Sequence, residues 1–250
     1  MASIAACRRD KPLVISVHGT LDPWAFAHHH ARKALFWRAY QRRSLAAATA
    51  VHVLTEVEAA EVRGVGIESP CAVIPNGVAC DRFGLAFAER IEEYFPRLAG
   101  KTVIASLGRI HPHKNLEALC RAFVAIRQQI PIGPNGELHL VVAGDGEASY
   151  VASLRNILAS AGALEASSWP GLVLGDGKSA LLARADVFVL PSISEGFSVV
   201  VLEALASGTA VAVSPGCKFR EVESARAGVV AGPDAGSLTA ALRDLLSDSS

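Results

Sequence analysis

Residues 190–204 read LPSISEGFSVVVLEA, a short apolar end followed by a polar loop with one glycine and then a longer apolar run. With the residues before it, this stretch predicts a strand over Asp186–Leu190, then a loop and a helix. In an open parallel sheet, ligands bind beyond the carboxyl ends of the strands, where the first free N–H groups of a helix can hold an anion. We therefore expect a ligand at this loop.

Two acidic residues mark the same stretch, Glu195 in the loop and Glu203 in the helix. Carboxylates that flank one ligand suit the vicinal hydroxyl groups of a sugar or a ribose. The alternative for each is a solvated surface acid. Against that alternative, Glu203 lies in a helix too apolar for the surface, so its charge calls for a partner.

The stretch is part of a longer alternation of short apolar runs and amphipathic segments, which is typical of βαβ units around a parallel sheet. Its clearest helix begins at Asn115, a candidate N-cap. Tight turns at strand ends are expected at Gly144-Asp145-Gly146 and Gly175-Asp176-Gly177. The predicted strands are Thr102–Leu107, Leu138–Ala143, Gly171–Gly175, Asp186–Leu190 and Ala210–Ser214.

The first 77 residues predict a smaller sheet, with a long helix at about 31–49 and a turn at Pro75-Asn76-Gly77. Its expected strands are Leu13–Val17, Val51–Leu54 and Ala72–Ile74. We therefore expect an α/β protein with a partial N-terminal domain over 1–80, a connector over 81–100 and a second domain over 101–250.

A second strand–loop–helix unit reads SLGRIHPHKN at residues 106–115 and carries two cations, Arg109 and Lys114. Beside a helix N-terminus, such cations can neutralise a diphosphate, Arg through its planar fork and Lys as a point charge. The alternative is that both are solvated loop charges.

The composition excludes several classes of protein. In 250 residues, 51% are apolar and 19% charged, and 24 Lys and Arg balance 24 Asp and Glu, so neither a disordered chain nor a nucleic-acid partner is indicated. Five dispersed cysteines predict no disulfide framework and no zinc site, and a reducing cytoplasm suits them best. The longest apolar run falls short of the ~20 residues that a membrane span needs.

The N-terminal fifth is locally basic, with eight Lys and Arg against two Asp in residues 1–50. Its segment 28–43, rich in His, Arg and aromatic residues, is a candidate for peripheral contact with anionic lipid headgroups at the inner face of the cell membrane. On a helical wheel these charges spread around the circumference, which favours a solvated helix instead.

The motifs taken together resemble the retaining, GT-B-fold glycosyltransferases of family 4, which contain the group-1 glycosyltransferase domain. That resemblance implies two Rossmann-like parallel-sheet domains and transfer of a sugar from a nucleotide-sugar donor to a saccharide or lipid-linked acceptor, in cell-surface polysaccharide or glycolipid biosynthesis. The motifs that carry it are VHGTL at 17–21, VIPNGV at 73–78, SLGRIHPHKN at 106–115, VVAGDG at 141–146, ADVFVLPS at 185–192, EGFSVVVLEA at 195–204 and GTAVAVSPG at 208–216.

The resemblance implies a role for each matching residue. Glu195 would contact the transferred sugar, Glu203 the ribose, and Arg109 with Lys114 the diphosphate. His18 would lie close to the reacting sugar and phosphate, the alternative being a structural histidine at a strand end. The family generally needs neither cofactor nor metal, and this chain has no D-x-D triplet. Backbone N–H groups that would assist at the diphosphate are those of Gly196, Phe197, Ser198 and Val199.

The chain departs from the family at both ends. The family's glycine-rich loop after the first N-terminal strand has no counterpart here, and the chain stops after a predicted helix at Leu238–Leu246, so we expect truncation at both ends. One alternative is therefore a fragment that binds nucleotide sugar without turnover. Another is a Rossmann dehydrogenase, suggested by Gly144-Asp145-Gly146, but Ser149 stands at its third glycine position.

Overall fold

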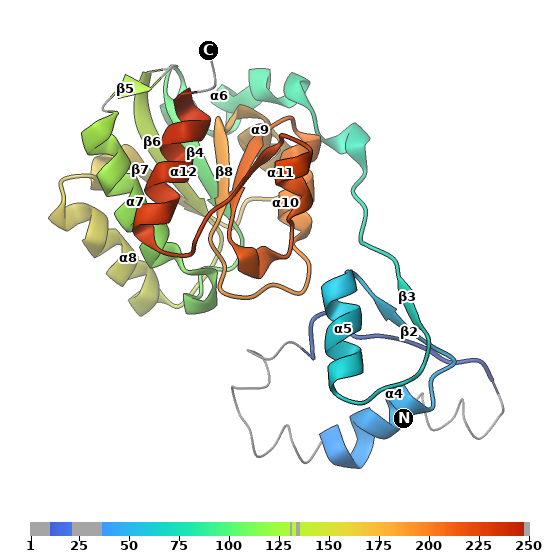
Figure 1. The fold of residues 1–250 in the computed structure, drawn as a ribbon. Helices are drawn as coiled ribbons and strands as arrows, with labels where there is room; N and C mark the ends of the chain where they lie inside the picture. Colours follow the sequence, from blue (N-terminus) through green and yellow to red (C-terminus); the bar gives the residue numbers. More distant parts are fainter. Residues whose placement is uncertain (1–10, 22–36, 131, 134–135, 248–250) are drawn as a thin grey trace. The chain divides into compact units, whose positions relative to one another are not determined.

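The computed structural model describes residues 11–21, 37–130, 132–133 and 136–247 (Figure 1). Its contacts divide the chain into two units, one of residues 1–76 with 194–197 and one of residues 77–193 with 198–250. Both contain parallel strands with helices, so the expected α/β class is confirmed. Residues 28–36 of the basic segment 28–43 lie outside the described residues, and so does Cys7.

The first unit has a parallel sheet in the order β1-β2-β3. Its strands are β1 (Val14–Ser16), β2 (Ala50–Val53) and β3 (Cys71–Val73), within a residue of the predicted positions. The described part of the expected long helix comprises η1 (Trp37–Gln41) and α4 (Arg42–Ala46), and α5 (Glu56–Gly64) follows β2. The small core is formed by Leu45 of α4, Val51 and Val53 of β2, Val62 of α5 and Ile67 after it, and partly buried residues of β1, η1 and β3 pack against it.

The second unit has a larger sheet, in which seven described strands follow the order β10-β9-β8-β4-β6-β5 with β7 paired to β6. Every pairing is parallel except that of β5 with β6. The central strands are continuous apolar runs because helices cover both faces. The strands are β4 (Thr102–Leu107), β5 (Ile132–Gly133), β6 (Gly136–Ala143), β7 (Ser167–Gly171), β8 (Val187–Leu190), β9 (Ala210–Val213) and β10 (Gly228–Val230).

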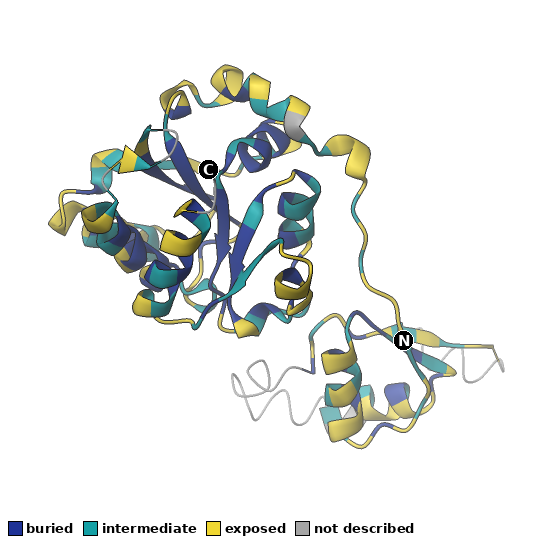
Figure 2. Cartoon of the chain, turned by 45° about the horizontal axis from the view of Figure 1, so that its top comes forward, coloured by how far each residue is buried: buried dark blue, intermediate teal, exposed yellow. Residues whose placement is uncertain are grey.

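Figure 2 shows the buried sheet of the second unit between helices whose outer sides are exposed. One face packs on α7 (Leu116–Gln129), α8 (Ala148–Ser160) and α12 (Ala235–Ser247), whose Phe123, Leu154 and Leu242 join the largest core. The other side of the sheet carries α9 (Gly175–Arg184) and α10 (Val199–Ala206), which contact each other. A short helix, α11 (Glu221–Ser224), precedes β10.

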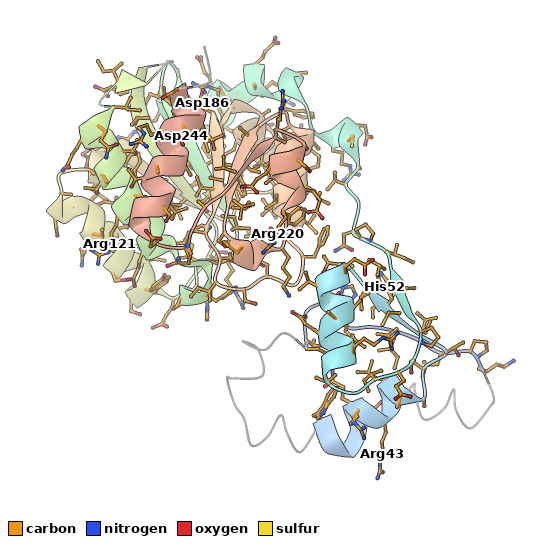
Figure 3. The ribbon with its side chains drawn as sticks, viewed as in Figure 1. Arg43, His52, Arg121, Asp186, Arg220 and Asp244 are labelled. Carbon is orange, nitrogen blue, oxygen red and sulfur yellow. The ribbon has the colours of Figure 1, made fainter. Side chains whose placement is uncertain are left out.

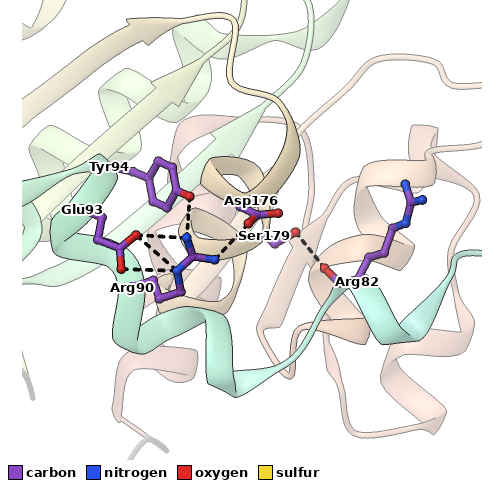
Figure 4. Close-up of polar contacts among 6 residues, drawn as sticks. All are labelled: Arg82, Arg90, Glu93, Tyr94, Asp176 and Ser179. Atoms are coloured by element: carbon purple, nitrogen blue, oxygen red, sulfur yellow. Dashed lines mark hydrogen bonds and ion pairs between the residues drawn. The ribbon is translucent and has the colours of Figure 1, made fainter.

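The segment 81–100 packs against α9. It contains η2 (Cys80–Arg82), η3 (Leu85–Arg90), α6 (Ile91–Tyr94) and η4 (Pro96–Leu98). Figure 4 shows the polar contacts: Arg90 binds Glu93 and Asp176, and the Ser179 hydroxyl donates to the Arg82 carbonyl at 2.8 Å. By its contacts, the expected connector thus lies with the second unit.

Two sequence predictions are wrong at one place. The strand predicted at Gly171–Gly175 lies earlier, as β7, and Gly175-Asp176-Gly177 begins α9 instead of forming a turn at a strand end. Gly171 has a φ of 74°, which ends the strand, and Leu172 and Leu174 after it are 62% and 68% exposed. Their apolar character therefore comes from exposed loop side chains and not from a buried strand.

Other expectations are met in part. The helix predicted at Asn115 does begin there, but the Asn115 side chain does not cap it. The described cysteines, Cys71, Cys80, Cys120 and Cys217, are all free, and burial raises the pKa of the Cys120 thiol to about 12. Within the described ranges, no helix has the length and apolar character that crossing a membrane requires.

Candidate functional site

The candidate site lies at the carboxyl edge of the second unit's sheet, where the loops after β4 and β6 run side by side. The N–H of Gly108 donates to the carbonyl of Ala143 at 3.0 Å, and the N–H of Ile110 to that of Asp145 at 2.8 Å. Gly144 has a φ of 141°, and a side chain there would collide with the Gly108 carbonyl. The glycines of these motifs therefore allow the backbones of the two loops to approach each other closely.

Arg109 and Lys114 line one small cavity at this edge, together with Ser106, Gly108 and Leu190. The Lys114 ammonium lies over Gly108, since a Cβ on that glycine would be 3.9 Å from Nζ. Lys114 is the last residue of the short helix η5 (Pro112–Lys114). This turn of the chain brings Lys114 back to the cavity that Arg109 lines, although four residues separate the two cations. The spacing that suggested a pair of cations thus does place them together.

Asn115 holds this loop against the next one. It adopts a left-handed conformation with a φ of 55°, which Asn tolerates, and its Nδ2 donates to the carbonyls of Pro191 and Pro233 at 3.3 and 2.7 Å. The N–H of Ile193 donates to the His113 carbonyl at 2.8 Å. The loops after β4 and β8 are therefore fixed to each other, a role that sequence reasoning missed.

The loop after β9 supports the loop after β8 from the other side. The Ser214 hydroxyl donates to the Ser192 carbonyl, and the Cys217 thiol to the Leu190 carbonyl at 3.1 Å. A side chain on Gly216 would collide with the carbonyl of Ile193. Figure 3 labels Arg220 after this loop and Asp186 at the opposite, amino-terminal edge of the sheet.

Six of the predicted site residues follow Ile193 in the chain, and Glu195 and Phe197 among them are half-buried. Residues 194–197 group by contacts with the first unit, and Glu195 is half-buried. Ser198 is buried and precedes α10 without capping it by its side chain, and Val199 begins the helix. The backbone N–H groups predicted to assist at the diphosphate, those of Gly196 to Val199, therefore lie directly before α10 and at its first residue.

Glu203 has the partner that its apolar helix called for. Its Oε2 lies 2.5 Å from Nζ of Lys178 on α9, and the two side chains retain 13% and 26% of their exposure. The sequence did not reveal Lys178, because Gly175-Asp176-Gly177 was interpreted as a turn. Had the helix been assigned from Gly175, Lys178 would have stood in its first turn as a candidate.

Two histidines of the first loop form a further pair. His111 and His113 have ring centroids 4.7 Å apart and Nδ1 atoms 2.7 Å apart. One of these Nδ1 atoms must carry a proton for this contact to be a hydrogen bond. The contact links two residues of the loop between Arg109 and Lys114, and the sequence contains no signal for it beyond the presence of both histidines.

His18 belongs to the first unit, two residues after β1. It is exposed, has a φ of 46°, and its ring meets that of His52 edge-on at a centroid distance of 6.0 Å. The turn is held by Glu58, buried on α5, whose carboxylate accepts from the N–H of Gly19 and, at 2.6 Å, from that of Leu54. The motif Thr55-x-x-Glu58 could have revealed Glu58, because it is a helix capping pattern.

His52 is held by hydrogen bonds on both of its ring nitrogens. Its Nε2 lies 2.8 Å from the Ile74 carbonyl, which can only accept, so Nε2 carries the proton. Its Nδ1 forms a hydrogen bond with the Ser16 hydroxyl at 2.8 Å, in which either atom can donate. The ring of His52 is therefore fixed from both sides where it contacts His18.

A larger cavity, of about 420 Å³, lies at the amino-terminal edge of the same sheet and contains none of the predicted site residues. Tyr94, Arg97, Arg155 and Trp169 are among its lining residues. Its size alone does not make it the candidate site, because the converging loops, the two cations and the N-terminus of α10 all lie at the opposite edge. In the described part of the chain, no group of three or more His, Cys, Asp or Glu could hold a metal ion.

Comparisons with known families match both parts of the chain. Residues 101–248 match the family model of "Glycosyl transferases group 1", and residues 1–82 match that of "Glycosyltransferase Family 4".

Curated relatives match the chain over part of their length. The phosphatidyl-myo-inositol mannosyltransferase of Mycobacterium tuberculosis is 36% identical over 157 residues, which is 62% of this chain and 37% of that protein. The mannosylfructose-phosphate synthase of Agrobacterium fabrum is 30% identical over 169 residues, 64% of this chain and 36% of the relative. The match thus spans little more than a third of each relative.

A solved structure shows the same fold. The crystal structure of HepE from Anabaena in complex with UDP and glucose aligns with a TM-score of 0.81 and 20% identity, over 99% of this chain and 65% of that one. The structure of WaaG, a glycosyltransferase involved in lipopolysaccharide biosynthesis, aligns with a TM-score of 0.75 and 16% identity, over 94% of this chain and 65% of that one. The GT-B-type fold expected from the sequence is therefore confirmed.

Proposed function

Because the chain belongs to the group 1 glycosyl transferases, we propose that it binds a nucleotide-sugar donor and transfers the sugar to a saccharide or lipid-linked acceptor. The observation that carries the proposal is the convergence of Arg109 and Lys114 at the carboxyl edge of the second sheet, where both side chains border the same small cavity. Two cations at one space beside helix N-termini suit a diphosphate.

Each part of the donor has a group suited to it. Arg109 and Lys114 bind the diphosphate, assisted by the N–H groups of the Gly196–Val199 segment that begins α10. Glu203 accepts hydrogen bonds from the ribose hydroxyls. The position of Glu203 on α10, half-buried and ionically paired, supports this role because the carboxylate is held in one place.

In the transfer step, the bond between the anomeric carbon and the diphosphate oxygen breaks and a bond to the acceptor oxygen forms. The proton of the acceptor hydroxyl passes to the departing diphosphate, and retention follows when both events occur on one face of the sugar. Arg109 and Lys114 stabilise the negative charge that develops on the diphosphate. Glu195 and His18 contact the reacting sugar, and no metal ion takes part.

The acceptor class is proposed from the relatives. Two of them are named for transfer to phosphatidyl-myo-inositol and for synthesis of mannosylfructose phosphate, a lipid and a saccharide product. We place the activity in the assembly of cell-surface polysaccharides or glycolipids, at the cytoplasmic face of the membrane.

Thermal unfolding with a panel of nucleoside diphosphates and their sugars tests donor binding. Binding to the native state alone should stabilise the chain by about 2.7 kcal/mol at a hundredfold excess over Kd. Arg109→Ala and Lys114→Ala should each weaken the affinity for the preferred diphosphate by about tenfold to a hundredfold, the value of a hydrogen bond to a charged group. Arg155→Ala, at the opposite edge of the sheet, is the matched control.

If no nucleoside diphosphate stabilises the chain, or if the control variant weakens binding as much as the two site variants, the proposal is wrong. Stabilisation without release of diphosphate in the presence of saccharide or lipid acceptors would favour the alternative, a chain that binds the donor without turnover.

A further inference from the structure

We propose that Lys178 is a positioning residue for the donor site, which holds the Glu203 carboxylate so that it selects a ribose by its hydroxyl groups. The inference rests on the proposed function, because that function assigns the ribose to Glu203. Lys178 lies outside the motifs that match the family and on a different helix from Glu203, and its proposed effect, selection for a ribose with hydroxyl groups, can be measured.

The first support is the contact itself. Lys178 Nζ and Glu203 Oε2 are 2.5 Å apart, and both side chains are largely buried. Oε2 is a buried atom without a well-directed hydrogen bond in the described part of the chain, so the attraction is ionic. Oε2 therefore faces inward to the ammonium, which leaves Oε1 as the oxygen that can accept from a ligand.

The second support is the setting of Glu203. The helix α10 reads VVVLEALA, so the carboxylate has apolar residues before and after it. An unpaired charge in such a position is costly, and the side chain would turn outward or lose its charge. Lys178 removes this tendency, because the ammonium offsets the negative charge and holds the carboxylate in one orientation.

The third support is the way in which Lys178 is itself held. The residues beside it are fixed by the segment 81–100, as Figure 4 shows. Arg90 Nη1 donates to Asp176 Oδ2 at 2.9 Å, and the Ser179 hydroxyl donates to the Arg82 carbonyl. The Tyr94 ring packs on Gly177, where a Cβ would lie 3.2 Å from it. The backbone on both sides of Lys178 is therefore anchored.

A purely structural ion pair would be an alternative role for Lys178, and ribose selection separates the two roles. A structural pair supports the fold, so its loss weakens every ligand alike. A positioning residue acts through one oxygen of Glu203, so its loss affects only ligands whose ribose has hydroxyl groups to donate.

The experiment compares two probes by calorimetry: the nucleoside diphosphate that stabilises the wild-type chain most, and its 2′,3′-dideoxy counterpart. We expect wild type to bind the ribose form at least about tenfold more tightly, as the loss of hydrogen bonds to a charged group predicts. In Lys178→Met this ratio should fall to about one to threefold, while the affinity for the dideoxy form stays within about twofold. Lys101→Met, just before β4 at the other edge, should leave the ratio unchanged.

Two further variants guard against misfolding. Lys178→Arg keeps the charge and should retain most of the ratio. Glu203→Gln removes the charge that Lys178 holds, so in the Lys178→Met background it should change the ratio no further.

The outcomes separate the inference from the proposed function. An unchanged ratio in Lys178→Met, or an equal loss for both probes, overturns the inference while the proposed function stands. A wild-type chain that binds neither probe overturns the proposed function, and the inference with it.

Discussion

The two units each have a carboxylate on the helix that follows a strand, and the two carboxylates are satisfied in opposite ways. Glu58 in the first unit accepts hydrogen bonds from the N–H groups of Gly19 and Leu54, one on each of its oxygens. Glu203 in the second unit is paired on one oxygen only, by Lys178. A carboxylate whose oxygens are both used by the backbone holds a turn, whereas one with a remaining oxygen can serve a ligand.

The largest expected effect comes from Glu58→Ala. The change leaves two backbone N–H groups without their acceptor, one of them at the buried Leu54, and should lower the free energy of unfolding by about 3 kcal/mol. Urea unfolding measures it. Glu56→Ala, an exposed acid in the same helix turn, should change the stability by less than about 0.5 kcal/mol.

If both variants proved equally mild, Glu58 would not be the anchor of the His18 turn, and the contrast between the two carboxylates would fail.

The next effect concerns a buried base of the second unit. His139 is 1% exposed, and its Nδ1 has no hydrogen-bond partner in the described part of the chain. Desolvation first, then Lys101, Arg97 and Arg127, lower its pKa to about 4 from 6.5. The folded state therefore binds fewer protons than the unfolded state, so stability is full above about pH 6.5 and falls as the pH drops toward 4.

The loss should reach as much as about 3 kcal/mol at the acid end of that window. His139→Gln, which cannot titrate, should flatten this part of the profile when unfolding is measured from pH 4 to 7. An equally steep profile in the variant would assign the acid sensitivity to other groups.

The smallest effect on stability, and the one that sharpens the comparison most, is that of Glu203→Ala. It leaves Lys178 unpaired but 26% exposed, where water can still reach it, so the cost should be about 1 kcal/mol. The affinity for the preferred nucleoside diphosphate should fall at least about tenfold in the same variant. A stability loss like that of Glu58→Ala with unchanged binding would make Glu203 structural as well.

Much of this fold could be predicted from the sequence, because continuous apolar runs are a strong signal of buried parallel strands. β4 was predicted at its observed bounds, and the meeting of Arg109 and Lys114 follows from the strand–loop–helix pattern. The pattern failed at Gly171–Gly175, where exposed leucines imitate a strand. Periodicity records only whether residues are apolar, and burial depends on the neighbours that the chain acquires later.

The partners of the acidic residues were beyond such reasoning for a related reason. Lys178 and Glu203 come from different helices, and their contact depends on how α9 and α10 pack on the sheet. The part that Asn115 plays is similar, because its acceptors, Pro191 and Pro233, are remote in sequence. Glu58 differs from Glu203 and Asn115, because the capping pattern that contains it spans only four residues and can be recognised in the sequence.

The strand order of the second sheet also has a consequence for synthesis on the ribosome. β4 lies between β6 and β8, yet β4 ends at Leu107 and β8 begins only at Val187. While the intervening residues are being translated, β4 can pair with β6 but presents an open apolar edge on its other side. Such an edge accepts wrong partners. The nascent chain therefore keeps this edge of β4 unpaired until residue 190 has emerged.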